Sequence, residues 1–163
     1  MIVFEQGGIC FNYRVAGVAI KNAQVLLCRE PKGDFWYLPG GRVELGEESR
    51  AALRREVREE LGVEVEIGRM VWVAENFFEL NGKRIHELGL YYLMEGPLEP
   101  SPEPFVVLIG SVGLEFRWFS LRELHHINLQ PEFLKTTLNA LPVRAKHIVP
   151  NALTDESPTA ERV

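Results

Sequence analysis

Runs of apolar residues divide the chain into short extended segments around one strongly helical stretch. Residues 13–20 and 24–28 are β-branched or aliphatic runs separated by a turn-like Lys-Asn-Ala, which predicts a hairpin. Residues 36–38 form a short aromatic run that stops at a Pro-Gly-Gly loop. Residues 49–61 are rich in Ala, Leu, Arg and Glu. Because Gly62 follows, as is typical after the last turn of a helix, this segment is predicted to be helical.

The second half of the chain is mostly extended. Residues 69–78 and 84–94 are apolar and β-branched runs on either side of an Asn-Gly turn, which predicts a long hairpin. A proline-rich stretch over 96–104 cannot pair inside a sheet and is expected to be a surface connection. Two further strands are expected over 105–109 and 116–119.

A late helix and a polar end complete the pattern. The helix is expected to start near Leu121 and to continue or restart after Pro131. Past residue 142 the chain is polar and aperiodic, so residues 1–142 are expected to form one domain and residues 143–163 a polar C-terminal tail. Strands before, around and after a central helix favour an α/β layered domain with a mixed β-sheet.

Composition and charge exclude several classes of protein. The 163 residues are 46% hydrophobic and 25% charged, which is typical of globular chains and not of disordered ones. The net charge of −5 creates no field that gathers polyanions, so neither a long nucleic acid nor a membrane is an expected partner. Cys10 and Cys28 lie in apolar stretches without metal-ligand spacing and are expected to be reduced core thiols. No apolar run approaches the roughly 18 residues of a membrane span, and no signal peptide is evident, so a cytoplasmic location is expected.

Three glutamates share one face of the predicted helix. Glu56, Glu59 and Glu60 fall within an arc of about 100° at helical spacing. An apolar stripe that includes Leu53 and Val57 lies beside them, so its packing would hold the carboxylates at the edge of the core. Their repulsion there calls for a divalent cation or raised pKa values, and carboxylate oxygens suit Mg²⁺ or Mn²⁺. Taken alone, the cluster is also consistent with a solvated face neutralised by neighbouring arginines.

The spacing between this helix and the loop before it is more specific. The residues that carry the pattern, in order, are Gly41, Glu47, Arg55, Glu56, Val57, Glu59, Glu60, Gly62 and Val63. The pattern resembles the Nudix box, GX5EX7REUXEEXGU with U aliphatic, at every specified position, and a Leu-Pro-Gly-Gly loop introduces it. The resemblance implies a Nudix-type α/β/α sandwich that covers Tyr13 to about Leu141.

The resemblance also implies roles for the residues of the box. Glu59 and Glu60 are the candidate metal ligands, and Glu56 is a further ligand or the base that deprotonates water. Arg55 is expected to orient the glutamates, with Glu47 as its carboxylate partner.

The loop glycines and an acid outside the box are further candidates for the site. Gly40 and Gly41 let the loop backbone approach a phosphate or the helix, and Gly41 can present its carbonyl to metal, although each could be an ordinary turn residue. A further acid is expected at Glu87 or Glu115, either of which could also be a strand-edge carboxylate. Glu87 is slightly preferred, because a lone carboxylate among the apolar residues of its strand is costly unless it is paired or ligating. Gly62 closes the box at the end of the helix.

Candidate substrate contacts are less distinctive. Trp36 and Phe77 could stack on a base, and Arg14 and Arg84 could meet phosphates. Aromatic strand residues more often build a core, however, and strand arginines usually face solvent. No spacing identifies the base or the group attached to the phosphates.

These features predict metal-dependent hydrolysis of a pyrophosphate bond in a small nucleotide, either a nucleoside diphosphate derivative or a nucleoside triphosphate. The alternative is a Nudix-fold module that binds a nucleotide or nucleotide sugar without turnover. The complete set of carboxylates favours the enzyme, since a sensor has no need of three ligating groups. A homodimer is left open.

Overall fold

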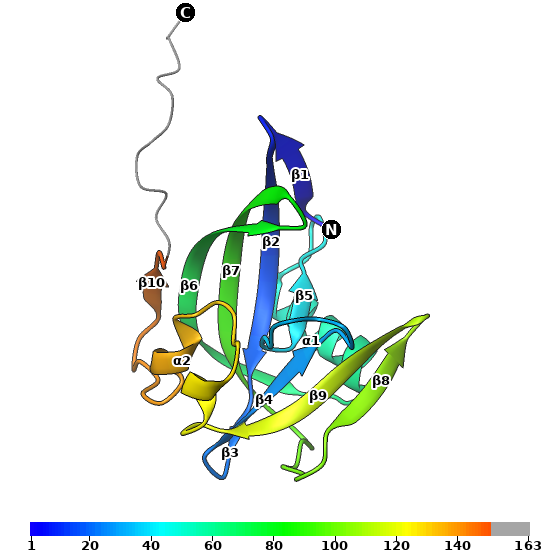
Figure 1. The fold of residues 1–163 in the computed structure, drawn as a ribbon, viewed down its shortest axis with the longest axis vertical. Helices are drawn as coiled ribbons and strands as arrows, with labels where there is room; N and C mark the ends of the chain where they lie inside the picture. Colours follow the sequence, from blue (N-terminus) through cyan, green and yellow to red (C-terminus); the bar gives the residue numbers. More distant parts are fainter. Residues whose placement is uncertain (151–163) are drawn as a thin grey trace, which may run out of the picture.

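The computed structural model describes residues 1–150 as two β-sheets with one long helix packed against them and short helical segments elsewhere (Figure 1). The strands are β1 (Val3–Gln6), β2 (Ile9–Val18), β3 (Ile20–Lys21), β4 (Gln24–Arg29), β5 (Gly40–Arg42), β6 (Glu66–Leu80), β7 (Lys83–Glu95), β8 (Phe105–Ile109), β9 (Val112–Ser120) and β10 (Lys146–Ile148). The helical segments are α1 (Ser49–Leu61), the 3₁₀ turn η1 (Leu124–His126) and α2 (Leu134–Thr137).

The six-stranded sheet is mixed. Its order is β1-β2-β7-β6-β10, with β5 paired to β2 outside that path. The β2–β7 and β6–β10 pairs are parallel, whereas β6 and β7 form the predicted antiparallel hairpin. The second sheet has the order β3-β4-β9-β8 and is antiparallel throughout. The predicted mixed α/β architecture is therefore confirmed.

The first predicted hairpin is wrong in its extent. Just Ile20-Lys21 pairs with Gln24-Val25, because the chain changes sheets between β2 and β4. The physical reason is that β2 pairs along its whole length with β7, which leaves β4 to join β9 in the other sheet.

The C-terminal part of the described chain also differs from expectation. The predicted late helix is reduced to η1 and α2, and Leu129 between them is buried, as is Leu134. Pro131 lies in this interval, where it cannot continue a helix. The predicted polar tail from residue 143 begins too early, because β10 pairs with β6 and extends the sheet. The remainder of that expected tail, 151–163, lies outside the described residues.

The predicted central helix has the expected ends. The Glu48 carboxylate accepts hydrogen bonds from the backbone N–H groups of Arg50 (3.0 Å) and Ala51 (3.1 Å), which caps the first turn. Gly62 closes the helix in the left-handed conformation with φ 67°. Across residues 1–150, no helix is both long enough and apolar enough to cross a bilayer.

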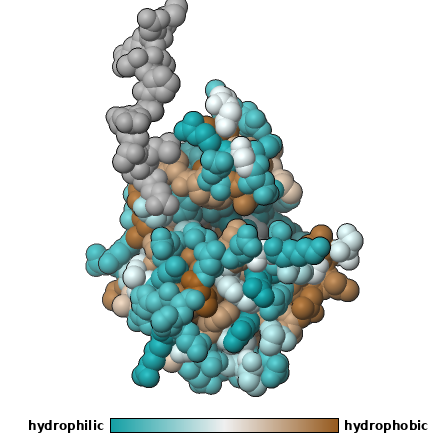
Figure 2. Space-filling model, viewed as in Figure 1, coloured by the Kyte–Doolittle hydropathy of each residue, from teal (hydrophilic) through white to brown (hydrophobic). Residues whose placement is uncertain are grey.

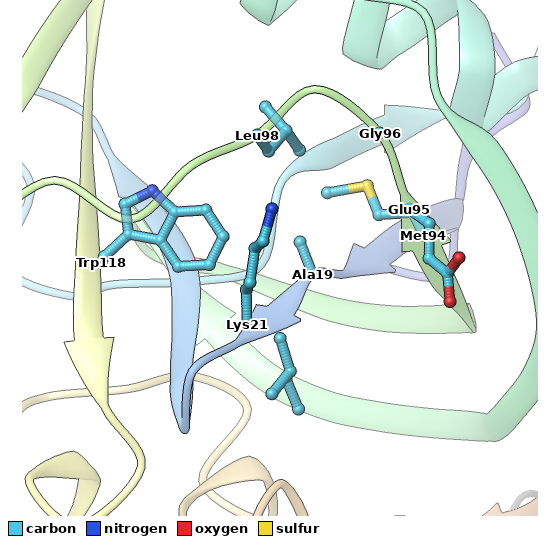
Figure 3. Close-up of a pocket in the computed structure, with 8 residues that line it drawn as sticks. Ala19, Lys21, Met94, Glu95, Gly96, Leu98 and Trp118 are labelled. Carbon is cyan, nitrogen blue, oxygen red and sulfur yellow. The ribbon is translucent and has the colours of Figure 1, made fainter.

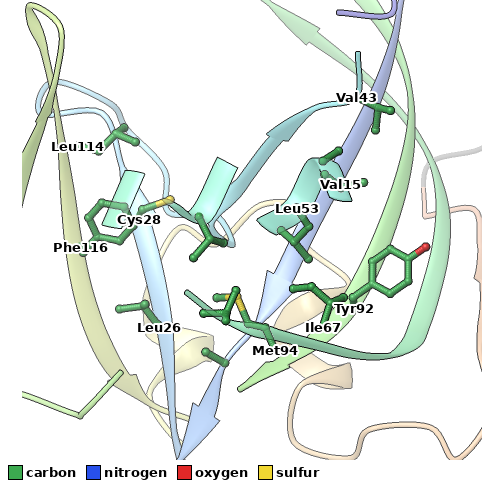
Figure 4. Packing of buried hydrophobic residues seen from close by; sticks show 14 of the residues in the cluster. Val15, Leu26, Cys28, Val43, Leu53, Ile67, Tyr92, Met94, Leu114 and Phe116 are labelled. Carbon is green, nitrogen blue, oxygen red and sulfur yellow. The ribbon is translucent and has the colours of Figure 1, made fainter. Parts of the chain in front are cut away.

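The apolar stripe of α1 fits into a core shared with both sheets (Figure 4). Leu53 and Val57 are fully buried in a cluster with Val15 of β2 and Phe116 of β9. This packing fixes the rotation of α1 about its axis and therefore where its glutamates lie. Of the two expected core thiols, Cys28 is buried in this cluster and Cys10 is partly exposed.

Candidate active site

α1 and β5 bring two of the predicted carboxylates against a pair of glycines. The Glu56 carboxylate lies over Gly41 so closely that a Cβ on that glycine would stand 2.1 Å from the carboxyl carbon. The backbone N–H of Gly40 donates a hydrogen bond to Glu60 Oε2 at 3.3 Å. Gly40 has φ 140° and abuts the Val15 carbonyl oxygen, 2.2 Å from where a Cβ would stand. Both glycines are therefore required by close approaches and not by a simple turn.

Arg55 donates hydrogen bonds to the Glu47 and Glu56 carboxylates on the exposed side of α1. Its Nε and Nη2 each donate to Glu47 at 2.9 Å, a bidentate pair that joins the helix to the loop before it. Its Nη1 donates to Glu56 Oε1 at 2.8 Å and stands 3.5 Å from Glu59 Oε2, and Nη2 also donates to the Arg42 carbonyl. The hydrogen bonds from Arg55 lower the pKa of the Glu47 carboxyl to about 2. The expected pairing of Arg55 with Glu47 is present.

Glu60 is a buried carboxylate with one hydrogen bond within residues 1–150, from the backbone N–H of Gly40. Burial raises the pKa of the Glu60 carboxyl to about 7; the nearby Arg14 guanidinium opposes the shift, and Glu56 adds to it. Arg14 Nη2 donates to the carbonyls of Leu38 (3.3 Å) and Gly40 (3.1 Å). Arg14 was expected to contact phosphate, but its guanidinium is engaged by the loop backbone and faces two carboxylates.

The second of those carboxylates is Glu87, which the sheet buries. Asn12 Nδ2 donates to Glu87 Oε2 at 2.7 Å, and Asn76 Nδ2 donates to Oε1 at 3.1 Å. Both asparagines are directly opposite Glu87 in the strand register. Asn12 and Arg14 are two residues apart on β2 and so face the same side of the sheet. Burial lowers the pKa of the Arg14 guanidinium, but Glu87 and Glu60 outweigh that effect and the pKa is raised.

Neither Asn12 nor Asn76 was predicted to contact Glu87. Each is a buried amide followed by an aromatic residue in its strand, and an asparagine at such a position is the signal that could have drawn attention to it. The pairing of β7 with both β2 and β6 is needed before the two amides can be placed on Glu87. Asn76 Oδ1 is buried without a hydrogen-bond partner in the described part of the chain.

Glu115, the other candidate acid, lies in the second sheet. Its carboxylate pairs with Arg29 of the neighbouring strand β4 at 2.8 Å. Within residues 1–150, no hydrogen bond or ion pair joins Glu115 to the α1 glutamates. The structure thus brings Glu87, and not Glu115, onto the sheet face occupied by Arg14.

The predicted aromatic contacts are placed differently from expectation. Trp36 is a buried core residue whose ring meets Phe119 edge-on at 4.8 Å, so it is not an open stacking surface. Phe77 stacks on His86 at 4.4 Å. It lies on the face of β6 opposite Asn76, because neighbouring strand residues alternate. Phe77 and Arg84 line a separate pocket of about 320 Å³ near the end of the β6–β7 hairpin.

A second pocket, of about 350 Å³, lies at the other end of β7 (Figure 3). It is lined by Ala19, Ile20, Lys21, Met94, Glu95, Gly96, Leu98 and Trp118. Lys21 at this pocket forms an ion pair with Glu99. None of the predicted site residues lines it, so the candidate active site is the surface formed by α1, β5 and the adjoining face of β2 and β7.

The residues at this surface fit a hard divalent cation. Glu56, Glu59 and Glu60 offer carboxylate oxygens, and Gly41 offers a carbonyl, which is the donor set that Mg²⁺ and Mn²⁺ prefer. A buried carboxylate with a single backbone hydrogen bond, next to a glycine cradle, is the observation that supports the fit. In the part of the chain that is described, no three of these carboxylates lie close enough together to hold a metal ion without a change in side-chain position.

Comparison with known proteins gives a consistent result. Residues 12–140 match the family model described as NUDIX domain. Human diphosphoinositol polyphosphate phosphohydrolase 3-beta is 30% identical over 156 residues, with 91% of this chain and 88% of that protein covered. CTP pyrophosphohydrolase of Escherichia coli K12 is 38% identical over 76 residues, which are 44% of this chain and just over half (55%) of that relative.

Solved structures show the same architecture. The E. coli ORF135 protein superposes with a TM-score of 0.52 at 28% identity, covering 80% of this chain and 89% of that one. A MutT protein from Bacillus halodurans superposes with a TM-score of 0.57 at 22% identity, covering 86% and 92%, which is a likeness of fold. The resemblance carried by the box residues is therefore confirmed, and the chain belongs to the NUDIX family.

Proposed function

We propose that this chain hydrolyses a pyrophosphate bond in a nucleoside diphosphate derivative or nucleoside triphosphate, using a divalent cation bound at α1. The observation that carries the proposal is the placement of Glu56 and Glu60 against Gly40 and Gly41, with Arg55 holding Glu56 from the other side. The name of one relative, CTP pyrophosphohydrolase, supports a nucleotide substrate, and that of the other, diphosphoinositol polyphosphate phosphohydrolase, supports hydrolysis of a phosphorylated small molecule.

Some of the box residues would bind the cation, and Arg55 would position one of these ligands. Glu59 and Glu60 would hold the cation together with Glu56 and the Gly41 carbonyl. Bound Mg²⁺, or Mn²⁺ in its place, would neutralise phosphate charge and stabilise the leaving group. Arg55 is a positioning residue, because its bidentate pair with Glu47 fixes the guanidinium that orients Glu56.

We assign the role of general base to Glu87, with Glu56 and Glu115 as the alternatives. Two amide groups donate to the two carboxylate oxygens of Glu87, so its orientation is fixed before substrate binds. Glu87 and Glu60 both raise the pKa of the Arg14 guanidinium through their negative charge, which supports their placement in one site. Glu115 is paired with Arg29 in the other sheet.

The charge of the chain favours a nucleotide over a more highly phosphorylated substrate. A substrate with many phosphate groups needs several free cations around it, but the net charge is −5. Arginines at the site are also engaged: Arg14 by backbone carbonyls, Arg42 by the Asn12 side chain and Arg55 by carboxylates. A binding module without turnover is the second class considered, and the complete set of box carboxylates favours the enzyme.

A screen of nucleoside triphosphates and nucleoside diphosphate derivatives with Mg²⁺ or Mn²⁺ tests the function through release of phosphate, pyrophosphate or monophosphate. We expect Glu60→Gln to lower kcat by about 10²-fold or more, since its charge would act mostly on the transition state. Glu64→Gln is the matched control, because Glu64 is exposed and pairs with Arg58 away from the site. Nucleotide binding without turnover under all metal conditions would support the binding module instead.

The base assignment is tested by separating rate from metal affinity. Glu87→Gln is expected to lower kcat by about 10²-fold or more, with little change in the Mg²⁺ concentration for half-maximal activity. Glu56→Gln is expected to impair both quantities. An unchanged kcat in Glu87→Gln would remove Glu87 from the mechanism, and a large loss confined to Glu115→Gln would transfer the role there.

A further inference from the structure

Strand β8 forms an apolar edge of the four-stranded sheet. It pairs with β9 on one side and ends the strand order, so among the described residues no strand covers its outer edge. Val106 is 60% exposed and Leu108 is 74% exposed, and Phe105 and Ile109 are also exposed. The β8–β9 hairpin projects from the body of the molecule, and its end carries hydrophobic surface (Figures 1 and 2).

This edge lacks the features by which monomeric proteins prevent strand-to-strand association. Such proteins place charged residues, proline or a bulge within an edge strand. Residues 105–114 include no charged residue and no proline, and the register between β8 and β9 is uninterrupted. The backbone N–H and C=O groups along the outer edge of β8 are thus in position to pair with another strand.

The other end strands of the two sheets are different. Each carries a charged residue: Glu5 in β1, Lys21 in β3 and Lys146 in β10. Glu5 and Lys21 also form ion pairs, with Lys83 and Glu99 respectively. An uncharged edge is therefore particular to β8 among the end strands in the described part of the chain.

We propose that β8 is the docking surface for a second copy of this chain, paired antiparallel with the same strand of its partner. Antiparallel pairing of a strand with itself satisfies two-fold symmetry, so one surface supplies both sides of the interface. When the pair is centred on Val107, Phe105 lies opposite Ile109 and Val106 opposite Leu108. Every such contact is apolar and none places like charges together, so the strand is complementary to itself. The two four-stranded sheets become one continuous sheet.

The test is the mass of the full chain in solution, measured by light scattering and sedimentation over a range of micromolar concentrations. We expect a species of twice the 18.6 kDa chain mass. Leu108→Lys would place two like charges close together at the pairing edge and is expected to halve that mass. Because Leu108 is so exposed, the fold should persist, and Val106→Lys provides a second variant of the same kind. Val143→Lys is the matched control, since Val143 is 88% exposed and precedes β10, far from β8 in Figure 1.

Amide hydrogen exchange locates the interface independently of any assay of hydrolysis. In the wild-type dimer the amides of residues 105–109 are expected to be protected, and Leu108→Lys should remove that protection while the β6–β7 hairpin keeps its own. A wild-type chain that is monomeric at all concentrations would overturn the proposal. So would a dimer that survives both lysine variants, or one in which the outer-edge amides of β8 exchange as fast as in the monomer.

Discussion

Replacement of Gly41 by alanine separates the chemistry of the site from the stability of the fold. A Cβ at this position would stand 2.1 Å from the Glu56 carboxyl carbon, whereas an ordinary contact is about 3.4 Å or longer. The carboxylate must therefore retreat by more than about 1 Å, and a displacement of that size can cost about 10²-fold in rate. The backbone of Gly41 does not require glycine, since its φ lies outside the left-handed region.

The stability of Gly41→Ala should stay within about 1 kcal/mol of wild type. Restricting the unfolded chain contributes about 0.4–1 kcal/mol, and a weakened contact between Arg55 and Glu56 costs a similar amount. Gly40→Ala is the contrasting control: its Cβ would meet the backbone oxygen of Val15 at 2.2 Å, and its φ is 140°. That variant should lose more than about 2 kcal/mol.

Thermal or urea unfolding of the two glycine variants gives the stabilities, and calorimetric titration with Mn²⁺ gives the metal affinity without reference to any substrate. We expect Gly41→Ala to bind Mn²⁺ at least about tenfold more weakly and to lose about 10²-fold in kcat. Wild-type Mn²⁺ affinity together with wild-type kcat would refute the role given to the close approach of Glu56. A Gly41→Ala protein as unstable as Gly40→Ala would refute the argument that a flexible carboxylate yields to the added methyl group.

Two further predictions concern groups at the edge of the site. The pKa of Glu47 is lowered from 4.5 to about 2 by Arg55, so its contribution to stability is present above pH 4.5 and is lost as pH falls toward 2; urea unfolding of Glu47→Gln should show a smaller loss of stability over that interval than wild type. Equal slopes in the two proteins would contradict this. Burial raises the pKa of the Cys28 thiol, so alkylation of the folded protein at pH 8 should leave it unmodified, and Cys28→Ala should lose about 1 kcal/mol of stability without a change in kcat. Loss of hydrolysis on alkylation of Cys28 would contradict both expectations.

Features with local causes could be predicted from the sequence. The start of α1 is capped by Glu48, and its end depends on Gly62, so both ends are encoded within a few residues. The β6–β7 hairpin is marked by Asn81 and Gly82, which both adopt positive φ in the turn. The spacing of the box likewise places its side chains along one helix and one loop.

Features that depend on residues far apart in the chain could not be predicted from the sequence. The parallel pairing of β2 with β7 joins residues about 75 apart and leaves no turn signal in the sequence, so the change of sheet before β4 was not foreseen. The same pairing brings Asn12 to Glu87, and the adjacent antiparallel pair brings Asn76. The burial of Trp36 depends on contact with Phe119, which only the second sheet supplies.

The exposure of the three α1 glutamates distinguishes a proposed cation site from an ordinary solvated helix face. On a solvated face all three would be open to water, and nearby arginines would neutralise them. Instead Glu60 is 7% exposed and the Glu56 side chain 17%, while that of Glu59 is 55% exposed at the rim. Arg55 reaches Glu56 and Glu59 but forms no ion pair with Glu60 within residues 1–150, and the hydrogen bonds of Arg14 go to backbone carbonyls. A buried, ionised carboxylate without an ion pair costs free energy of folding unless it is protonated or binds a cation. Since its pKa of about 7 makes protonation easily reversed, a divalent cation can displace that proton at neutral pH, which supports Glu60 as a ligand of the proposed site.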